Sequence, residues 1–128
     1  MITRNQKYAA EIFVQVKALP KEDHKKYGSM AHKLPVLIRT AGLVQALEFV
    51  NSRGDAAQQK LLGHLASVLR RQSDRALLDY SRTAGIAEYM RLTHDALGAL
   101  TWYKRFAQSV LKVLPGDEEN GEGDDIPE

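Results

Sequence analysis

Apolar residues recur every three to four positions along most of this chain, which is the spacing of an amphipathic α-helix. Within residues 3–18, for example, one side of a helix would carry Tyr8, Ala9, Ile12, Phe13 and Val16. We find no internal repeat, and no run of residues alternates cleanly enough to predict a β-strand. The pattern therefore predicts an all-α protein, a compact bundle of about five to six helices.

Prolines, glycines and capping residues divide this pattern into elements. Thr3 is expected to cap the first helix, and Pro20 marks the break after it. Pro35 suits the first turn of a third helix, and Asp55 suits the cap of a fourth. The expected helices cover about residues 3–18, 22–33, 35–50, 56–71 and 74–82, followed by a short helical piece at 84–91 and a last helix that begins near Thr93 and ends before Pro115.

The most apolar segment is KLPVLIRTAGLVQALEFV, residues 33–50. A membrane span needs about 20 predominantly apolar residues, whereas this segment is shorter and contains Arg39 and Glu48. Its apolar residues cover most of a helix circumference, which is typical of a central helix with neighbours on several sides. Gly42 lies in its middle and predicts a kink, a break or a close helix contact.

The last expected helix has a narrow polar stripe that contains three cations and no anion: Thr101, Lys104, Arg105, Gln108, Ser109 and Lys112. The remaining arc of this helix is apolar and too wide for one neighbour. We therefore expect it to be packed on two sides, or to present part of its surface to another protein.

The net charge of +2 combines two unlike regions. Residues 116–128, GDEENGEGDDIPE, hold seven of the sixteen acidic residues and no Lys or Arg, so residues 1–115 hold all 18 cations against nine acids. We predict a basic helical domain over 1–115 and a disordered acidic tail over 116–128, because the tail has too few apolar residues to fold. The tail is either an inert solubilising segment or a competitor for the basic surface.

Nothing in the sequence supports catalysis. The chain has no cysteine, and His24, His32, His64 and His94 are scattered without the spacing of metal ligands. We expect all four histidines to be ordinary residues at the surface or its boundary. There is no glycine-rich phosphate loop and no nucleophile-elbow motif. We expect no catalytic residue, no metal and no cofactor. The polar N-terminus does not resemble a signal peptide, and the absence of cysteine suits a cytoplasmic protein.

Cations form three groups that suit a phosphate backbone, which binds rows of Lys and Arg on one surface. The groups are Lys21, Lys25, Lys26 and Lys33 with Arg39; Arg70, Arg71 and Arg75; and Lys104, Arg105 and Lys112. For the first two groups, an ordinary solvated face or a helix-dipole preference remains an alternative. Trp102, Tyr103 and Phe106 would suit base stacking, although aromatic residues at this spacing equally suit a core. No motif for reading base sequence is present.

Three stretches together resemble a known family: QKYAAEIF (6–13), KKYGSMAHKLPVLIRTAGLVQALEFV (25–50) and EYMRLTHDALGALTWYKRFAQSVL (88–111). They resemble the small subunit of Cmr-type (type III-B) CRISPR effector complexes, over residues 6–112 and without the acidic tail. The resemblance implies an all-α subunit without a catalytic site. It also implies partners: backbone and large subunits, neighbouring copies of itself, and a guide RNA–target RNA duplex or single-stranded target, with no membrane.

The same resemblance implies RNA-facing positions. Lys33 and Arg39 of KLPVLIR, and Lys104 and Arg105 of WYKRFA, are the first choices. Charge alone adds Lys25, Lys26, Arg70 and Arg71. The alternative function is a helical assembly adaptor with no direct nucleic-acid contact, whose apolar arcs bind protein and whose charges keep it soluble.

Overall fold

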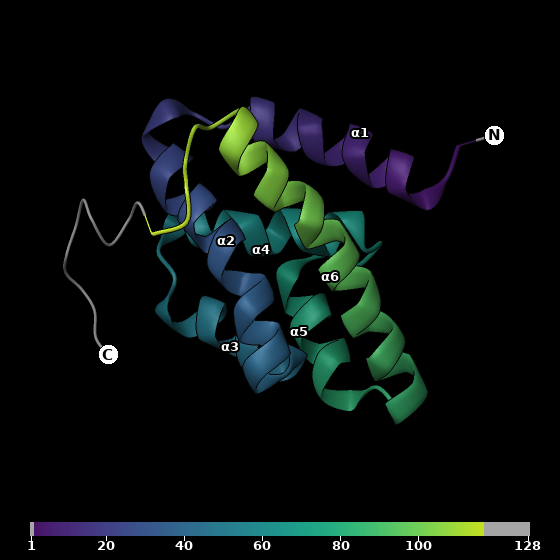
Figure 1. Ribbon diagram of the computed structural model, residues 1–128. Helices are drawn as coiled ribbons and strands as arrows, with labels where there is room; N and C mark the ends of the chain where they lie inside the picture. Colours follow the sequence, from purple (N-terminus) through teal and green to yellow (C-terminus); the bar gives the residue numbers. More distant parts are fainter. Residues whose placement is uncertain (1, 117–128) are drawn as a thin grey trace.

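The computed structural model describes residues 2–116, which form six α-helices, one turn of 3-10 helix and no strand (Figure 1). The elements are α1 (Arg4–Lys17), η1 (Lys21–Asp23), α2 (His24–Ala41), α3 (Leu43–Arg53), α4 (Ala56–Val68), α5 (Asp74–Thr83) and α6 (Ile86–Ser109). The prediction of an all-α bundle is confirmed. The predicted disordered tail, apart from Gly116, lies outside the described residues.

Both predicted N-caps are present, and each is a capping box. Thr3 Oγ1 accepts a hydrogen bond from the Gln6 backbone N–H, and the Gln6 side chain accepts one from the Thr3 N–H. Asp55 and Gln58 exchange the same pair of bonds at the start of α4. These reciprocal bonds satisfy N–H groups that have no partner inside the helix, so two of the predicted boundaries follow from local chemistry.

The predicted boundary at Pro35 is wrong, because α2 continues through this proline to Ala41. The chain breaks instead at Gly42, whose φ of +94° is a conformation that favours glycine. The Gly42 N–H still donates to Ile38 O at 2.9 Å and so closes the last turn of α2. Residues 33–50 are therefore the end of α2 followed by α3, and the expected single helix over 35–50 does not form. The central position belongs to α2, which packs against α3, α4 and α6.

The last helix is longer at its start than predicted. α6 runs without interruption from Ile86, so the separate helical piece at 84–91 and the start near Thr93 are both wrong. The Thr93 hydroxyl donates to Tyr89 O, one turn earlier in the same helix, and does not act as a cap. At the other end α6 stops at Ser109, and Lys112 has a φ of +62° in the segment that follows. Lys112, which was predicted to belong to the polar stripe of this helix, therefore lies outside it.

α6 packs against α1 on one side and α2 on the other, which is one of the two alternatives that its wide apolar arc left open (Figure 1). The core is mostly aliphatic and includes three buried tyrosines, Tyr8, Tyr27 and Tyr103. Its fully buried leucines include Leu34, Leu47, Leu62, Leu65, Leu77 and Leu100. Phe13 departs from the prediction, because it is 41% exposed although Ile12 and Val16 beside it are buried. Phe13 lies at the edge of the apolar stripe of α1, where its ring meets Phe106 of α6.

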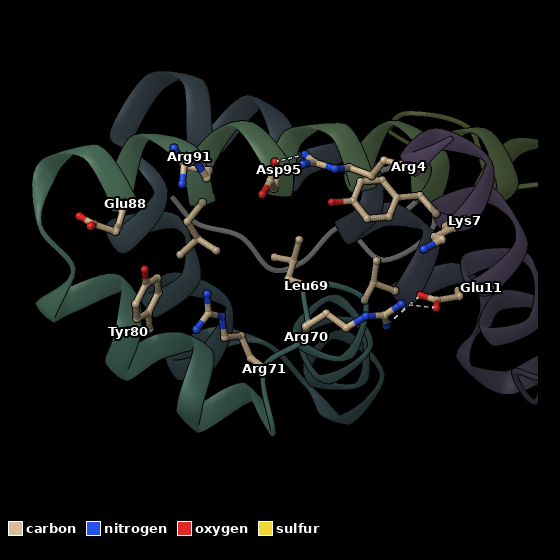
Figure 2. A pocket seen from close by; sticks show the side chains of 13 residues that line it. Arg4, Lys7, Glu11, Leu69, Arg70, Arg71, Tyr80, Glu88, Arg91 and Asp95 are labelled. Atoms are coloured by element: carbon tan, nitrogen blue, oxygen red, sulfur yellow. Dashed lines mark hydrogen bonds and ion pairs between the residues drawn. The ribbon is translucent and has the colours of Figure 1, made fainter. Parts of the chain in front are cut away.

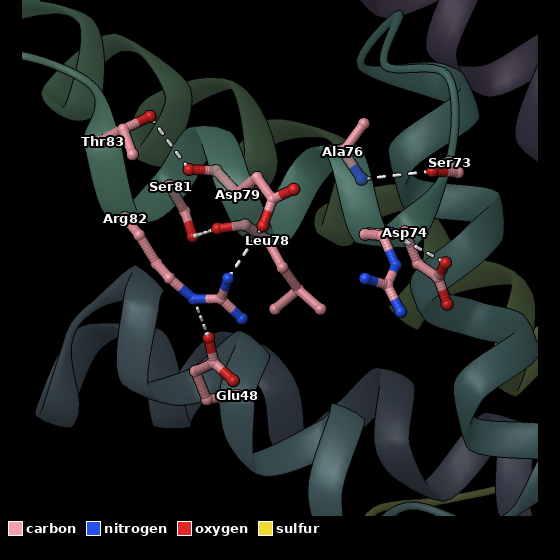
Figure 3. A network of polar contacts seen from close by, with 10 residues as sticks. Glu48, Ser73, Asp74, Ala76, Leu78, Asp79, Ser81, Arg82 and Thr83 are labelled. Carbon is pink, nitrogen blue, oxygen red and sulfur yellow. Dashed lines mark hydrogen bonds and ion pairs between the residues drawn. The ribbon is translucent and has the colours of Figure 1, made fainter.

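α5 is attached to α3 by a charged contact (Figure 3). Arg82 Nε donates to Glu48 Oε2 at 2.6 Å, and its Nη1 donates to Asp79 Oδ1 at 2.8 Å. Ser73 begins α5 by accepting a hydrogen bond from the Ala76 N–H. Two carboxylates thus compensate the charge of Arg82, and this cation stabilises the bundle.

Candidate nucleic-acid interface

The C-terminal part of α2 and the C-terminal half of α6 enclose a groove of about 290 Å³. Its walls bring together cations from two of the sequence groups: Arg39 comes from α2, and Lys104 and Arg105 come from α6. Pro35, Leu97, Thr101 and Gln108 complete the lining. We refer to this set as the α2–α6 groove.

The α2–α6 groove is basic, and no acidic side chain in its described lining compensates the charge of its three cations. Among the described residues, no carboxylate lines it, and none forms an ion pair with Arg39, Lys104 or Arg105. Arg39 is exposed in the last turn of α2, where the helix dipole favours a cation. That preference explains Arg39 alone. It does not explain two more cations facing the same groove from another helix, which repel one another unless an anion is bound.

An aromatic cluster adjoins the α2–α6 groove. The Arg105 guanidinium lies 5.7 Å from the Trp102 ring centroid, and the Phe106 ring packs between Trp102 and Phe13 at centroid distances of 5.8 and 5.4 Å. Trp102 and Phe106 are half-buried, whereas Tyr103 is fully buried. The core interpretation is therefore correct for Tyr103, and the other two rings keep accessible surface beside a cation. Phe13 was missed as a surface residue because helical spacing placed it with the core.

The remaining predicted positions lie elsewhere. Lys33 is exposed on α2 but does not line the α2–α6 groove. Lys25 is exposed near the start of α2, where Lys26 Nζ lies 3.8 Å from Asp55 Oδ2. The surface around Lys25 and Lys26 therefore carries charges of both signs.

Arg70 and Arg71 follow α4 and line a different hollow, between α1, α5 and α6 (Figure 2). Arg70 donates to both carboxylate oxygens of Glu11, at 2.7 and 3.3 Å. Hydrogen bonding to Glu11 raises the pKa of Arg70 above its usual value. The charge of Arg70 is thus matched within the chain, which distinguishes it from Arg39.

The histidines make structural contacts. Nε2 of His32 lies 2.9 Å from Val113 O, Nε2 of His24 lies 3.2 Å from Leu19 O, and Nδ1 of His64 lies 2.7 Å from the Tyr27 hydroxyl. His32 is buried, contrary to the expectation that all four histidines lie at the surface or its boundary. Within residues 2–116, no three metal-ligating side chains cluster. None of the helices described is both long enough and apolar enough to cross a membrane.

Comparison with known proteins places this architecture in one family. A family model described as CRISPR-associated protein (Cas_Cmr5) matches residues 4–110. The chain is 44% identical over 113 residues to the CRISPR system Cmr subunit Cmr5 of Thermus thermophilus, covering 88% of this chain and 99% of the relative. The crystal structure of a CRISPR-associated Cmr5 family protein from the same organism superimposes with a TM-score of 0.77 at 43% identity, over 86% of this chain and 98% of that one. The resemblance seen in the sequence is confirmed: the chain belongs to the Cmr5 family of CRISPR-associated proteins.

Proposed function

We propose that this chain is a non-catalytic small subunit of a type III-B Cmr CRISPR effector complex, and that it contacts guide RNA or target RNA through the α2–α6 groove. The 44% identical relative is named a subunit of a Cmr system, and this supports membership of such a complex. The observation that carries the RNA contact is the convergence of Arg39, Lys104 and Arg105 on a groove without a lining carboxylate among the described residues.

The proposed contact is independent of base sequence. Lys and Arg side chains bind phosphates by charge and release the counterions condensed on the RNA, and phosphate contacts carry no sequence information. The adjoining Trp102 and Phe106 rings would add stacking on unpaired bases, which tolerates any base. In a filament with neighbouring copies, backbone subunits and the large subunit, successive grooves would line the channel in which guide and target pair.

A second candidate function is an assembly adaptor that contacts protein alone. The observation that favours it is at the start of α6, where Ile86 is 75% exposed and Met90 is 63% exposed. These two side chains lie four residues apart and so face the same way. A pair of large apolar side chains on one exposed helix face is typical of a protein contact.

The two functions differ in the salt dependence of RNA binding. We would measure the affinity of the purified chain for a mid-length single-stranded RNA by fluorescence anisotropy, at low and at near-physiological salt. For phosphate contacts, the logarithm of affinity falls linearly with the logarithm of salt concentration, with a slope of about 0.7 per single-strand phosphate neutralised. An apolar protein interface predicts no RNA binding at either concentration.

The decisive variants are Arg39→Glu and the pair Lys104→Glu/Arg105→Glu. The pair should weaken binding at low salt by about tenfold or more and reduce the salt slope, because each neutralised phosphate contributes to both. Arg53→Glu/Arg75→Glu is the matched control, since it changes net charge equally at two exposed arginines outside the groove. Equal losses in both pairs would mean that net charge alone binds RNA. Absence of binding by the wild-type chain would favour the adaptor.

A further inference from the structure

A second basic hollow, of about 390 Å³, lies on the side of α6 opposite the α2–α6 groove (Figure 2). The α6 residues that line it are Glu88, Arg91, Leu92 and Asp95, and those that line the α2–α6 groove are Leu97, Thr101, Lys104, Arg105 and Gln108. At about 100° of rotation per residue, these two sets point roughly half a turn apart. We call the second site the Arg71 hollow. The two sites therefore lie on different faces of the protein.

The Arg71 hollow carries more positive charge than its own acids compensate. Five cationic and three acidic side chains line it, which leaves a charge of +2. Two of the cations are paired inside the hollow, Arg4 with Asp95 and Arg70 with Glu11. Within the described part of the chain, the remaining charges of the hollow are Lys7, Arg71 and Arg91 against the single carboxylate Glu88.

The Arg71 side chain is held in place by an aromatic ring. Its guanidinium carbon lies 3.9 Å from the centroid of the Tyr80 ring, so the planar group is stacked on the ring. Its Nε is buried, and no described residue accepts a hydrogen bond from it. A guanidinium presents five N–H donors in a rigid fork that matches the oxygens of a phosphate or carboxylate. Because Nε is enclosed, a ligand in the hollow would be bound by the terminal Nη groups of this guanidinium.

We propose that the Arg71 hollow binds a single phosphate group carrying two negative charges, held between Arg71 and Arg91. Figure 2 shows Arg71 and Arg91 on different walls, one from the connection after α4 and the other from α6. A phosphate monoester carries about −2 near neutral pH, which matches the two guanidinium charges of Arg71 and Arg91. A carboxylate, or a phosphodiester within an RNA chain, carries a single charge and leaves one cation uncompensated.

The test uses the full chain and inorganic phosphate, titrated against sodium chloride of equal ionic strength at about pH 7.5, where phosphate is mostly doubly charged. The buried Arg71 Nε–H gives a side-chain NMR signal that reports the site directly. We expect this signal to shift and to saturate with phosphate but not with chloride. A shift that chloride reproduces, or one that never saturates, overturns the proposal.

Arg91→Gln should weaken phosphate binding at least about tenfold, since it removes one of the two charged donors to the bound group. The control is Arg53→Gln, an exposed arginine outside the hollow, which should leave the affinity unchanged. Unchanged circular dichroism in both variants excludes misfolding as the cause. Equal affinities in the two variants overturn the assignment.

Two further ligands identify the source of the phosphate. Uridine monophosphate that binds as tightly as inorganic phosphate indicates free phosphate, and tighter binding indicates the terminal phosphate of a nucleotide; either result supports the site. An RNA without a terminal phosphate that shifts the Arg71 signal equally well overturns the proposal, and makes the hollow part of a larger RNA surface.

Discussion

At the scale of single residues, the contact between Tyr27 and His64 is a polar interaction that involves a buried core side chain. The Tyr27 hydroxyl lies 2.7 Å from His64 Nδ1, and the two rings meet edge to face at 5.6 Å. Burial raises the pKa of Tyr27, so the hydroxyl keeps its proton at its contact with the His64 imidazole. Burial, together with the charge of Lys60, lowers the pKa of His64.

The lowered pKa makes stability depend on pH. Because folded His64 resists protonation, the unfolded chain binds a proton first as pH falls below its ordinary pKa of 6.5. The stabilising effect is therefore complete above pH 6.5 and declines below it, by at most about 1.4 kcal/mol per pH unit because one imidazole binds a single proton. Urea unfolding at several pH values should show a smaller pH slope for His64→Gln than for the wild type.

The control for this prediction is Gln72→Ala, because Gln72 is exposed and carries no titratable group. Its pH slope should match that of the wild type. If His64→Gln also keeps the wild-type slope, His64 is not the group that links protonation to folding.

Single residues also show why charge alone identifies a site poorly. Arg39 and Arg70 occur in similar basic stretches, yet Arg70 is paired with Glu11, which lies 59 positions away in sequence. Arg39 has no acidic partner within residues 2–116. The sequence shows a cation in both cases, and only the fold decides whether a carboxylate reaches it.

At the scale of elements, the segment after α6 is packed onto α2. Val113 is buried, and its carbonyl oxygen lies 2.9 Å from His32 Nε2. This approach depends on Gly28: a Cβ added there would lie 2.8 Å from Val113 Cβ, closer than carbon atoms pack. Gly28 is thus where the segment after α6 meets the central helix.

Two glycine substitutions test this packing. Gly28→Ala should lower the free energy of unfolding by about 1–3 kcal/mol, because its methyl group forces Val113 away. Gly63→Ala in α4 is the matched control: nothing lies within 4 Å of its added Cβ, and alanine should raise helix stability by about 0.5–1 kcal/mol. Denaturant unfolding of both variants measures the difference. A stabilised Gly28→Ala variant would mean that Val113 moves aside at little cost.

Local chemistry determines some of the helix boundaries, and packing determines the others. The capping boxes at Thr3 and Asp55 contain both partners within four residues, so the sequence displays them completely. Pro35 misled the prediction, because a proline suits a first turn but is also tolerated inside a helix where packing holds the helix together. Thr93 was wrongly predicted to begin a helix, because its hydroxyl can also donate a hydrogen bond to a carbonyl oxygen inside a helix, here Tyr89 O of α6.

At the scale of the whole molecule, the unequal distribution of charge predicts an effect of the tail. Residues 116–128 carry seven acids, and residues 1–115 carry nine more cations than acids. If the tail competes with RNA, deletion of residues 116–128 should strengthen RNA binding severalfold at low salt, and the gain should vanish at high salt because salt screens the competition. Anisotropy titrations of both chains measure it.

A chain of full length with Asn and Gln in place of the tail acids separates charge from length. It should bind RNA like the deletion variant. Unchanged affinity of both variants at low salt would identify the tail as an inert solubilising segment.

The sequence by itself determined the all-α class, the caps at Thr3 and Asp55 and the family, because periodicity and short motifs are local properties of the chain. The tertiary structure decided what depends on contacts between distant residues. It decided that Arg39 meets Lys104 and Arg105 in one groove, that Glu11 neutralises Arg70, and that Arg71 lies stacked on Tyr80 in the same hollow as Arg91. Charges along a sequence can be counted, but whether they add at one surface or cancel depends on which helices pack together.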